Sequence, residues 1–257
     1  MNIPTMRLDG KVALITGSGS GLGKAVAEGL ASFGADIVIT EISSKLELGQ
    51  DVAREIAGNS GRKVIALPLD LPDLASIDRL VTAAVAQMGK IDILINNAGV
   101  QVSKDALDVT EADWDIVIDT HLKGTFFTSQ RVAKEMIKQK SGRIINMASQ
   151  LGLVGYYKRA AYSAAKAGIV NLTRALAVEW AGYGINVNAV APTFIRTTLS
   201  EQAFSDPKIY NDLISRIPLG RVGLPEEIIG PMLFLASDAS TLVTGHTLSV
   251  DGGWTAM

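Results

Sequence analysis

Cysteine is absent from the sequence, which excludes disulfide bonds, thiolate metal sites and a cysteine nucleophile. Histidine is scarce: the chain has two, and neither stands in a carboxylate cluster at the spacing of metal ligands, so we expect no catalytic metal. No run of about 18 apolar residues occurs, so no membrane span is predicted. Residues 1–10 lack a basic region followed by an apolar stretch, so no secretory signal is predicted. These absences favour a cytoplasmic protein.

The charge of the chain is nearly balanced. Its 24 Lys and Arg residues are matched by 26 Asp and Glu residues, which gives a formal net charge of −2. This balance gives no reason to expect nucleic acid or an anionic membrane as a partner, so a small molecule is the expected ligand. Hydrophobic residues make up 47% of the chain, enough for a large core, and no linker or repeat divides residues 1–257, so we expect one domain.

Short apolar runs rich in Val and Ile alternate with longer amphipathic segments. The runs are nearly continuous in apolar residues, which is typical of parallel strands covered on both faces. They are 12–16, 36–40, 64–67, 91–95, 143–147, 185–190 and 246–250. The amphipathic segments are predicted helices at 22–33, 45–58, 73–88, 111–139, 160–182 and 225–237. This alternation predicts an α/β fold with a doubly wound parallel sheet.

One stretch breaks the alternation. Residues 192–218 carry Thr, Ser and Asp, with a short helix predicted around 199–215. A long excursion at the carboxyl end of a strand is a common place for a loop that covers a substrate. We therefore interpret 192–218 as a substrate loop, and an ordinary surface insertion is the alternative.

A glycine-rich segment directly follows the first predicted strand. Gly17, Gly21 and Gly23 have the spacing Gly-x-x-x-Gly-x-Gly between a strand and a helix. Glycines allow a sharp turn and a close approach of backbone N–H groups to a pyrophosphate, and the start of the helix adds partial positive charge. A lone glycine-rich loop is a weak signal, but this context favours dinucleotide binding. The predicted contacts are Gly17, Ser20, Gly21, Leu22 and Gly23.

Polar residues follow the next three predicted strands. Glu41 ends the second strand, about twenty residues past the glycines, where a carboxylate can accept hydrogen bonds from the adenosine ribose and would repel a 2′-phosphate. No Arg or Lys stands in the glycine loop or just after Glu41, so the sequence favours NAD(H); the alternative is a solvated carboxylate. Further predicted cofactor contacts at strand ends are Asp70, Leu71, Asn97, Ala98 and Gly99.

Tyr162 and Lys166 lie four residues apart in a predicted helix, so they share one helical face. A nearby ammonium lowers the pKa of a tyrosine, whose phenol can then exchange a proton with an alcohol or a carbonyl as hydride moves. Lys166 can also hydrogen-bond the nicotinamide ribose. Ser149, at the end of the fifth predicted strand, can hold the substrate oxygen. The Tyr/Lys spacing is common by chance, but with Ser149 and the glycine turn it predicts a catalytic site.

These motifs together resemble the classical short-chain dehydrogenase/reductase family over nearly the whole chain. The matching pieces are Thr16–Gly23, Asp70, Asn96–Gly99, Ser149, Tyr162, Lys166, Asn188–Pro192 and Val250–Gly253. The resemblance implies a seven-stranded Rossmann sheet, with Tyr162 as general acid/base, Lys166 tuning its pKa and Ser149 holding substrate. It also implies a homotetramer in which helices such as 111–139 and 160–182 pack between subunits. The corresponding cofactor contacts after the sixth strand are Pro192, Ile195 and Thr197.

Two residues depart from the family pattern. His121 occupies the position where the family usually has the Asn of a catalytic tetrad, which is thought to anchor a water in a proton relay. An imidazole also donates and accepts hydrogen bonds and titrates near neutrality, so His121 is a candidate catalytic residue with an altered pH profile; the alternative is that it packs at a helix kink. Thr193 follows Pro192 where the family usually has Gly, which would stiffen the loop or add a hydroxyl near the nicotinamide.

The basic residues before Tyr162 are candidate substrate contacts. Arg can hold a carboxylate with two hydrogen bonds, which suits an acidic substrate. Lys104 and Arg196 lie on other loops over the same strand ends. For each cation taken singly, solvated surface charge is the alternative. The predicted substrate contacts are Gln150, Lys158 and Arg159.

Three functions remain open. Segments 105–114, 216–225 and 251–254 resemble gluconate 5-dehydrogenases and 2-keto-3-deoxygluconate 5-dehydrogenases, which favours an NAD-dependent dehydrogenase of a sugar acid, sugar or polyol. Similar strings occur in 3-oxoacyl-carrier-protein reductases, so an NADP(H)-dependent reductase is the alternative, against which Glu41 argues. The third is a catalytically weak protein that senses nicotinamide or scaffolds partners; His121 alone favours it.

Overall fold

The computed structural model describes residues 4–197, 200–201 and 204–257, which form a single Rossmann-like domain. Its centre is a seven-stranded parallel sheet with the strand order β3-β2-β1-β4-β5-β6-β7. The strands are β1 Val12–Ile15, β2 Asp36–Glu41, β3 Val64–Pro68, β4 Ile93–Asn96, β5 Gly142–Met147, β6 Ile185–Pro192 and β7 Thr247–Val250. The predicted doubly wound, seven-stranded parallel sheet is confirmed, with small shifts at the strand ends.

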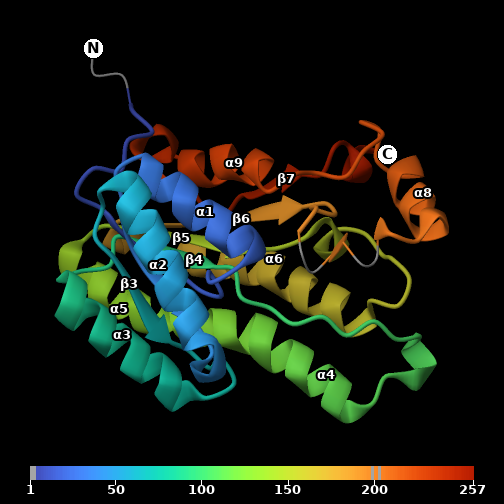
Figure 1. Ribbon diagram of the computed structural model, residues 1–257, viewed down its shortest axis with the longest axis horizontal. Coiled ribbons are helices and arrows are strands. Elements are labelled where there is room, and N and C mark those ends of the chain that lie inside the picture. The colour runs from blue at the N-terminus through green and yellow to red at the C-terminus, as the bar shows by residue number, and fades with distance from the viewer. Residues whose placement is uncertain (1–3, 198–199, 202–203) are drawn as a thin grey trace.

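Helices cover both faces of the sheet (Figure 1). On one face lie α1 Gly21–Ser32, α2 Leu46–Ser60 and α9 Glu226–Ala236, and on the other lie α3 Leu74–Met88, α5 Gly124–Gln139 and α6 Ala160–Trp180. Successive strand residues enter opposite cores: in β1, Ala13 and Ile15 face the first layer, and Val12 and Leu14 face the second. All four are buried, which explains why the run is continuously apolar.

The winding of the sheet reverses at its middle. From β1 the chain passes outward through β2 to β3, then returns to β4 on the other side of β1 and continues to β7. The loops after β1 and β4 therefore diverge at the carboxyl edge and leave a crevice between them. This topology places the glycine-rich segment after β1 beside residues 97–99 after β4.

The segment predicted as one helix at 111–139 is divided into three parts. The first, α4 Glu111–Ile118, begins with a reciprocal cap: Thr110 accepts from the backbone of Asp113, and the Asp113 side chain accepts from the backbone of Thr110. A π-helical turn, Asp119–Lys123, then leads into α5. The predicted helix over 111–139 is confirmed in its bounds, and the wider turn within it re-aims the side chains there, among them His121.

In the stretch 192–218, α8 Pro207–Ser215 matches the later part of the helix predicted around 199–215. Asp206 caps this helix by accepting from the backbone N–H of Lys208 at 2.8 Å. Residues 198–199 and 202–203 of the prediction lie outside the described residues. Phe204, Leu213, Ile217 and Val222 form a small core with Trp254, so α8 lies near the carboxyl terminus (Figure 1).

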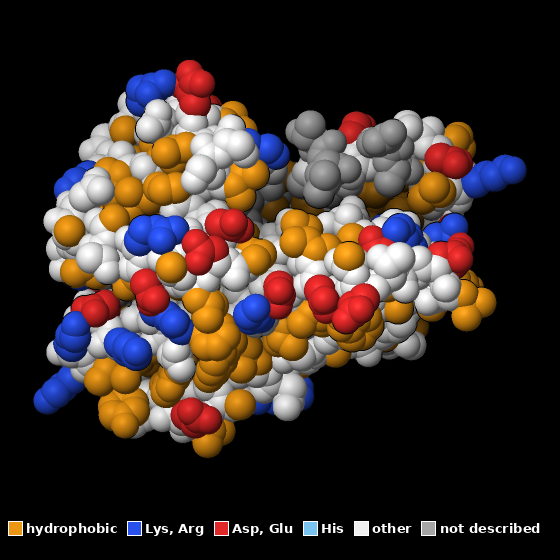
Figure 2. Space-filling model, turned by 90° about the horizontal axis from the view of Figure 1, so that it is seen from below, with side chains coloured by type: hydrophobic (Ala, Val, Ile, Leu, Met, Phe, Trp, Pro, Cys, Tyr) orange, Lys and Arg blue, Asp and Glu red, His pale blue; other side chains and the backbone are white. Residues whose placement is uncertain are grey.

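Within residues 4–197, 200–201 and 204–257, no helix is long and apolar enough to cross a membrane. In the same residues, no group of three or more His, Asp or Glu side chains is placed to hold a metal ion. The face of the molecule in Figure 2 carries Lys, Arg, Asp and Glu side chains interspersed with hydrophobic ones. This mixture agrees with the small net charge of −2.

Candidate active site

A cleft of about 700 Å³ runs along the carboxyl edge of the sheet. Its walls include all but one of the predicted site residues: Gly17, Ser20, Gly21, Leu22, Gly23, Glu41, Asp70, Leu71, Asn97, Ala98, Gly99, His121, Ser149, Gln150, Arg159, Tyr162, Lys166, Pro192, Ile195 and Thr197. The exception is Lys158, whose ammonium lies 3.4 Å from the Asp105 carboxylate outside the cleft lining. Residues far apart in the chain meet here because parallel strands end at one edge.

The glycine turn lies at one end of the cleft, and Gly17 and Gly23 pack tightly against the protein whereas Gly21 has open space beside it. Gly17 has a φ of +62°, and a Cβ there would lie 2.9 Å from Ala98. A Cβ on Gly23 would lie 2.4 Å from the Gly17 carbonyl oxygen, whereas one on Gly21 would meet nothing closer than Thr197 at 3.9 Å. Ser20 makes no side-chain cap at the start of α1, so the first amides of that helix stay available for an anion.

The loop after β4 braces this turn. Thr16 Oγ1 accepts from the backbone N–H groups of Asn97 and Ala98 at 2.9 and 3.0 Å. In return, the Asn97 side-chain amide donates to the carbonyl oxygens of Thr16 and Gly17, both at 3.0 Å. The Asn97 amide is therefore used within the protein, where it fixes the shape of the turn.

Glu41 lies at the end of β2, directly over the glycine segment. A Cβ on Gly19 would lie 2.5 Å from Glu41 Cγ, so the glycine lets this side chain pack against the turn. Asp70, after β3, lines the same end of the cleft. Lys45 lines it too, a residue that sequence reasoning missed because it lies four positions past Glu41. The 3₁₀ turn Ser43–Lys45 brings Lys45 back toward the cleft. The prediction from the sequence considered only the residues next to Glu41 and so did not include Lys45.

Tyr162 and Lys166 project from one face of α6 toward the end of β5. The Lys166 ammonium lies 5.5 Å from the centre of the Tyr162 ring and donates to the Met147 carbonyl oxygen at 2.5 Å. Ser149 caps the 3₁₀ turn Gln150–Gly152: its hydroxyl accepts from the Leu151 N–H at 3.1 Å and donates to Gln150 Oε1 at 3.2 Å. The tyrosine, lysine and serine thus meet at one end of the cleft.

Burial dominates the proton affinities of this group. It lowers the pKa of Lys166 to about 7, because the charged ammonium loses water. Burial also raises the pKa of Tyr162, against the opposing effects of the Ser149 hydroxyl and the Arg159 charge. The lowering of the Tyr162 pKa by a protonated Lys166 stays a prediction, and burial acts against it.

His121 is buried in the π-helical turn, behind Tyr162. Its ring meets the Tyr162 ring edge-to-face at 5.3 Å, and its Nε2 lies 2.8 Å from the Val100 carbonyl oxygen. The same Nε2 lies 3.2 Å from the Val100 backbone nitrogen, so it donates to the carbonyl or accepts from the N–H according to the tautomer, and Nδ1 has no partner among the described residues. Burial, helped by the Lys166 charge, lowers the pKa of His121 to about 3, so the expectation that it titrates near neutrality is wrong. A Cβ on Gly99 would lie 2.2 Å from this ring, so glycine is required there.

Thr193 adds a hydroxyl to the cleft wall, which agrees with the second of the two predictions made for it from the sequence. The residue is 9% exposed and lines the cleft, and its Oγ1 has no hydrogen-bond partner within the described part of the chain. Together with the glycine cradle and the uncapped start of α1, this unpaired hydroxyl fits a nicotinamide dinucleotide laid along the strand ends. The residues present are thus suited to hold that group.

Comparisons with known proteins agree with this geometry. Residues 17–255 match the family model described as enoyl-(acyl carrier protein) reductase. The chain is 44% identical, over the full length of both chains, to 2-dehydro-3-deoxy-D-gluconate 5-dehydrogenase of Dickeya dadantii. It is also 44% identical to 3-oxoacyl-[acyl-carrier-protein] reductase of Thermotoga maritima, over 96% of this chain and 99% of that one. A crystal structure of gluconate 5-dehydrogenase from Burkholderia cenocepacia, in complex with NADP and tartrate, matches with a TM-score of 0.94 at 37% identity over 98% of each chain.

Proposed function

Because the chain belongs to the short-chain dehydrogenase/reductase family, we propose that it transfers a hydride between NAD(H) and the CH–OH carbon of a sugar acid, sugar or polyol. The observation that carries the proposal is the meeting of Ser149, Tyr162 and Lys166 in one cleft with the glycine turn. The similarity to 2-dehydro-3-deoxy-D-gluconate 5-dehydrogenase supports the substrate class.

Tyr162 is the general acid/base of the proposed reaction. When bound, the nicotinamide accepts the hydride in oxidation and supplies it in reduction. Because burial raises the pKa of Tyr162, its phenol is protonated at neutral pH and suits proton donation to a carbonyl oxygen. In the opposite direction the phenol must first lose that proton, so alcohol oxidation should accelerate as the pH rises. Ser149 can donate to the same substrate oxygen by turning its hydroxyl away from Gln150.

Lys166 and His121 act on the position and charge of Tyr162. The Lys166 ammonium, 5.5 Å from the Tyr162 ring, favours the tyrosinate whenever it is protonated. His121 is neutral at working pH and holds one edge of the Tyr162 ring through its contact at 5.3 Å. We assign it a positioning role through its hydrogen bond to Val100, which ties the π-helical turn to the loop after β4.

For the cofactor we propose NAD(H), on the basis of Glu41. Its carboxylate lies over Gly19, where it can accept from the ribose hydroxyls and would repel a 2′-phosphate. Lys45 on the same wall has the charge that a 2′-phosphate prefers, and one structural relative binds NADP. We place Glu41 above Lys45 in importance because the Glu41 side chain lies against Gly19 in the glycine turn.

Kinetics with both nucleotides test this assignment. We expect Glu41→Gln to raise kcat/KM with NADP about tenfold by removing like-charge repulsion, while Lys45→Gln, the matched control, lowers it. The assay follows reduced nucleotide formation from NAD and NADP. Wild-type preference for NADP would refute the cofactor assignment.

A 3-oxoacyl reductase is the second candidate, favoured by the Thermotoga maritima relative. A panel of sugar acids, sugars and polyols with NAD, beside a 3-oxoacyl thioester with NADPH, separates the two activities. Turnover confined to the thioester would replace our proposal.

We further propose that residues 192–218 close over the substrate and that the chain is a homotetramer. Sedimentation equilibrium tests the homotetramer. Exposed apolar side chains on α4 and α6, Trp114 and Val178, support that assembly.

A further inference from the structure

The end of the cleft that contains Tyr162 carries positive charge. Among the described residues, two acids line the cleft: Glu41 at the end of β2 and Asp70 after β3, on the opposite side of β1 from β5. At the Tyr162 end, the charged lining residues are Lys166 and Arg159. The described wall around the reacting group therefore contains cations and no carboxylate, so it attracts an anion.

Arg159 differs from the basic residues around it. Those residues are each paired with an acid: Lys158 with Asp105 at 3.4 Å, Lys104 with Asp113 at 2.6 Å, and Arg196 with Glu201 at 2.9 Å. Arg159 has no ion pair with any residue that the structure describes, and its Nη1 donates to the Lys158 carbonyl oxygen at 3.1 Å. Most of the five N–H groups of its half-buried guanidinium are therefore free to bind a ligand.

The backbone that presents Arg159 is in an unfavourable conformation. Lys158 has a φ of +57°, a left-handed conformation that residues with a side chain rarely adopt. Arg159 then occupies the N-cap of α6 and makes no side-chain cap there. A cation at a helix start opposes the helix dipole, and Ser, Thr or Asp would stabilise the helix more. Such local costs are typical of residues that serve a ligand.

The distance between Arg159 and Tyr162 limits the size of the ligand. Arg159 is the N-cap of α6, Tyr162 follows three positions later, and both line the same cleft. A carboxylate on the guanidinium would then lie only a few carbon atoms from a hydroxyl at Tyr162. The planar guanidinium can hold both carboxylate oxygens in two parallel hydrogen bonds.

We propose that Arg159 binds the carboxylate of the substrate, so that the enzyme acts on short hydroxy acids in preference to neutral polyols and acyl thioesters. This inference rests on the proposed function, because it takes Tyr162 as the reacting group. Among the predicted substrate contacts it separates Arg159 from Lys158, whose charge is neutralised by Asp105 outside the cleft.

Binding of a small hydroxy acid to the complex of enzyme and NADH tests the site without turnover. We expect calorimetry with tartrate to show a loss of affinity of roughly 10- to 100-fold in Arg159→Gln, the effect of removing a charge-assisted hydrogen-bond pair. The matched control Lys158→Gln removes the adjacent cation and should change the affinity less than about twofold. Arg159→Lys keeps the charge without the planar fork and should fall between the two.

Kinetics with gluconate and with D-glucitol, which has the same chain length without a carboxylate, give a second measure. Arg159→Gln should raise KM for gluconate by roughly 10- to 100-fold and leave kcat/KM for glucitol within about threefold. An equal loss for both substrates, with a shifted pH profile, would mean that Arg159 acts only through Tyr162 and would overturn the inference.

The two proposals fail in different ways. Failure of wild-type enzyme to bind tartrate or gluconate, or an equal loss in Lys158→Gln, overturns the carboxylate site even if glucitol is oxidised. Faster turnover of a 3-oxoacyl thioester than of any hydroxy acid overturns it too. Tartrate binding that depends on Arg159, without turnover of any alcohol, supports the site and refutes the oxidoreductase proposal instead.

Discussion

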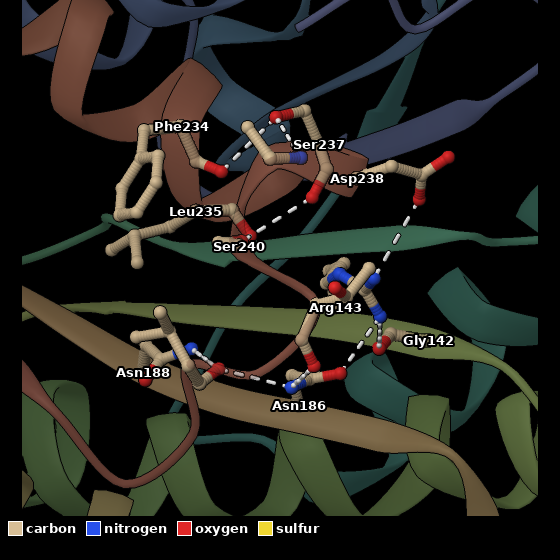
Figure 3. A network of polar contacts seen from close by, with 12 residues as sticks. Gly142, Arg143, Asn186, Asn188, Phe234, Leu235, Ser237, Asp238 and Ser240 are labelled. Atoms are coloured by element: carbon tan, nitrogen blue, oxygen red, sulfur yellow. Dashed lines mark hydrogen bonds and ion pairs between the residues drawn. The ribbon is translucent and has the colours of Figure 1, made fainter. Parts of the chain in front are cut away.

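The amino and carboxyl ends of the strands, called here the amino edge and the carboxyl edge of the sheet, differ in whether their buried polar side chains have partners. At the amino edge, Arg143 in β5 donates to Asn186 Oδ1 at 2.8 Å and to the Gly142 carbonyl oxygen at 3.2 Å, and lies 3.7 Å from Asp238 (Figure 3). Asn186 in turn donates to the carbonyl oxygens of Thr241 and Val243. Apart from Arg143 Nε, the polar atoms named here have partners within the protein.

At the carboxyl edge, several buried polar groups lack such partners. Thr193 Oγ1 and His121 Nδ1 have none among the described residues, and Arg159 has no carboxylate. Burial also lowers the pKa of Lys166 to about 7. An unpaired buried polar group costs about 1–3 kcal/mol, and these unpaired groups line the cleft, unlike Arg143 Nε at the other edge. The difference indicates that the amino edge serves the fold and the carboxyl edge serves a ligand.

The largest expected effect is on activity at the carboxyl edge. Tyr162→Phe removes the proton that the phenol exchanges and should lower kcat by about 10²- to 10⁴-fold. Thermal stability and NADH binding, followed by fluorescence, should stay close to wild type, because the ring and its contact with His121 remain. Tyr183→Phe, at a half-exposed residue outside the cleft lining, is the control and should keep full activity. Substantial turnover by Tyr162→Phe would contradict the assigned role.

A change at His121 should alter how stability depends on pH. Its pKa is about 3 in the folded protein and about 6.5 when unfolded, so the unfolded state binds more protons between these values. Stability is therefore complete above pH 6.5 and falls as the pH drops toward 3, by up to about 1.4 kcal/mol per pH unit.

The variant His121→Asn should show a shallower decline over this range in urea unfolding between pH 4 and 7. The comparison with wild type removes the contribution of the carboxyl groups common to both proteins. Identical slopes would show that His121 is not held neutral by burial.

At the amino edge, the same kind of substitution should affect stability and leave catalysis alone. Arg143→Met deprives Asn186 of a donor and should lower the free energy of unfolding by about 2–3 kcal/mol. Activity per folded molecule should stay within about twofold, since Arg143 lies outside the cleft lining. Arg54→Met breaks an exposed ion pair with Asp51 and should cost less than about 0.5 kcal/mol. Loss of turnover in Arg143→Met without loss of stability would contradict the assignment of the amino edge to stability and the carboxyl edge to ligand binding.

The smallest change in stability expected at a buried residue is a gain. Lys166→Met removes a buried ammonium and should raise the free energy of unfolding at pH 7 by about 1–2 kcal/mol while abolishing turnover. Because the folded pKa of Lys166 lies below its usual 10.5, stability is lost as the pH falls from about 10 toward 7, and the variant should lack this slope. Denaturant titration at pH 7 and 9 measures both. A destabilised variant would show that the hydrogen bond to Met147 outweighs the cost of burial.

Local sequence features predicted most of the strands and helices, because strand burial and helix amphipathicity are written in the spacing of apolar residues. The helix at 111–139 was predicted with its bounds but without its π-helical turn. Its apolar pattern continues across Asp119–Lys123, and the π-helical turn there arises where His121 packs between Val100 and Tyr162. Contacts with segments distant in the chain decided that turn, so periodicity could not reveal it.

For the site, the sequence by itself determined which chemical groups are available and where each leaves its strand or helix: the glycine turn, Glu41, Ser149, and the Tyr162–Lys166 spacing. Only the tertiary structure decided their charge states and partners. Burial comes from many segments at once, so it set the pKa of Lys166 near 7 and that of His121 near 3. The ion pair with Asp105, likewise, neutralises Lys158 and leaves its neighbour Arg159 as the cation facing the cleft, because two adjacent side chains leave the backbone in different directions.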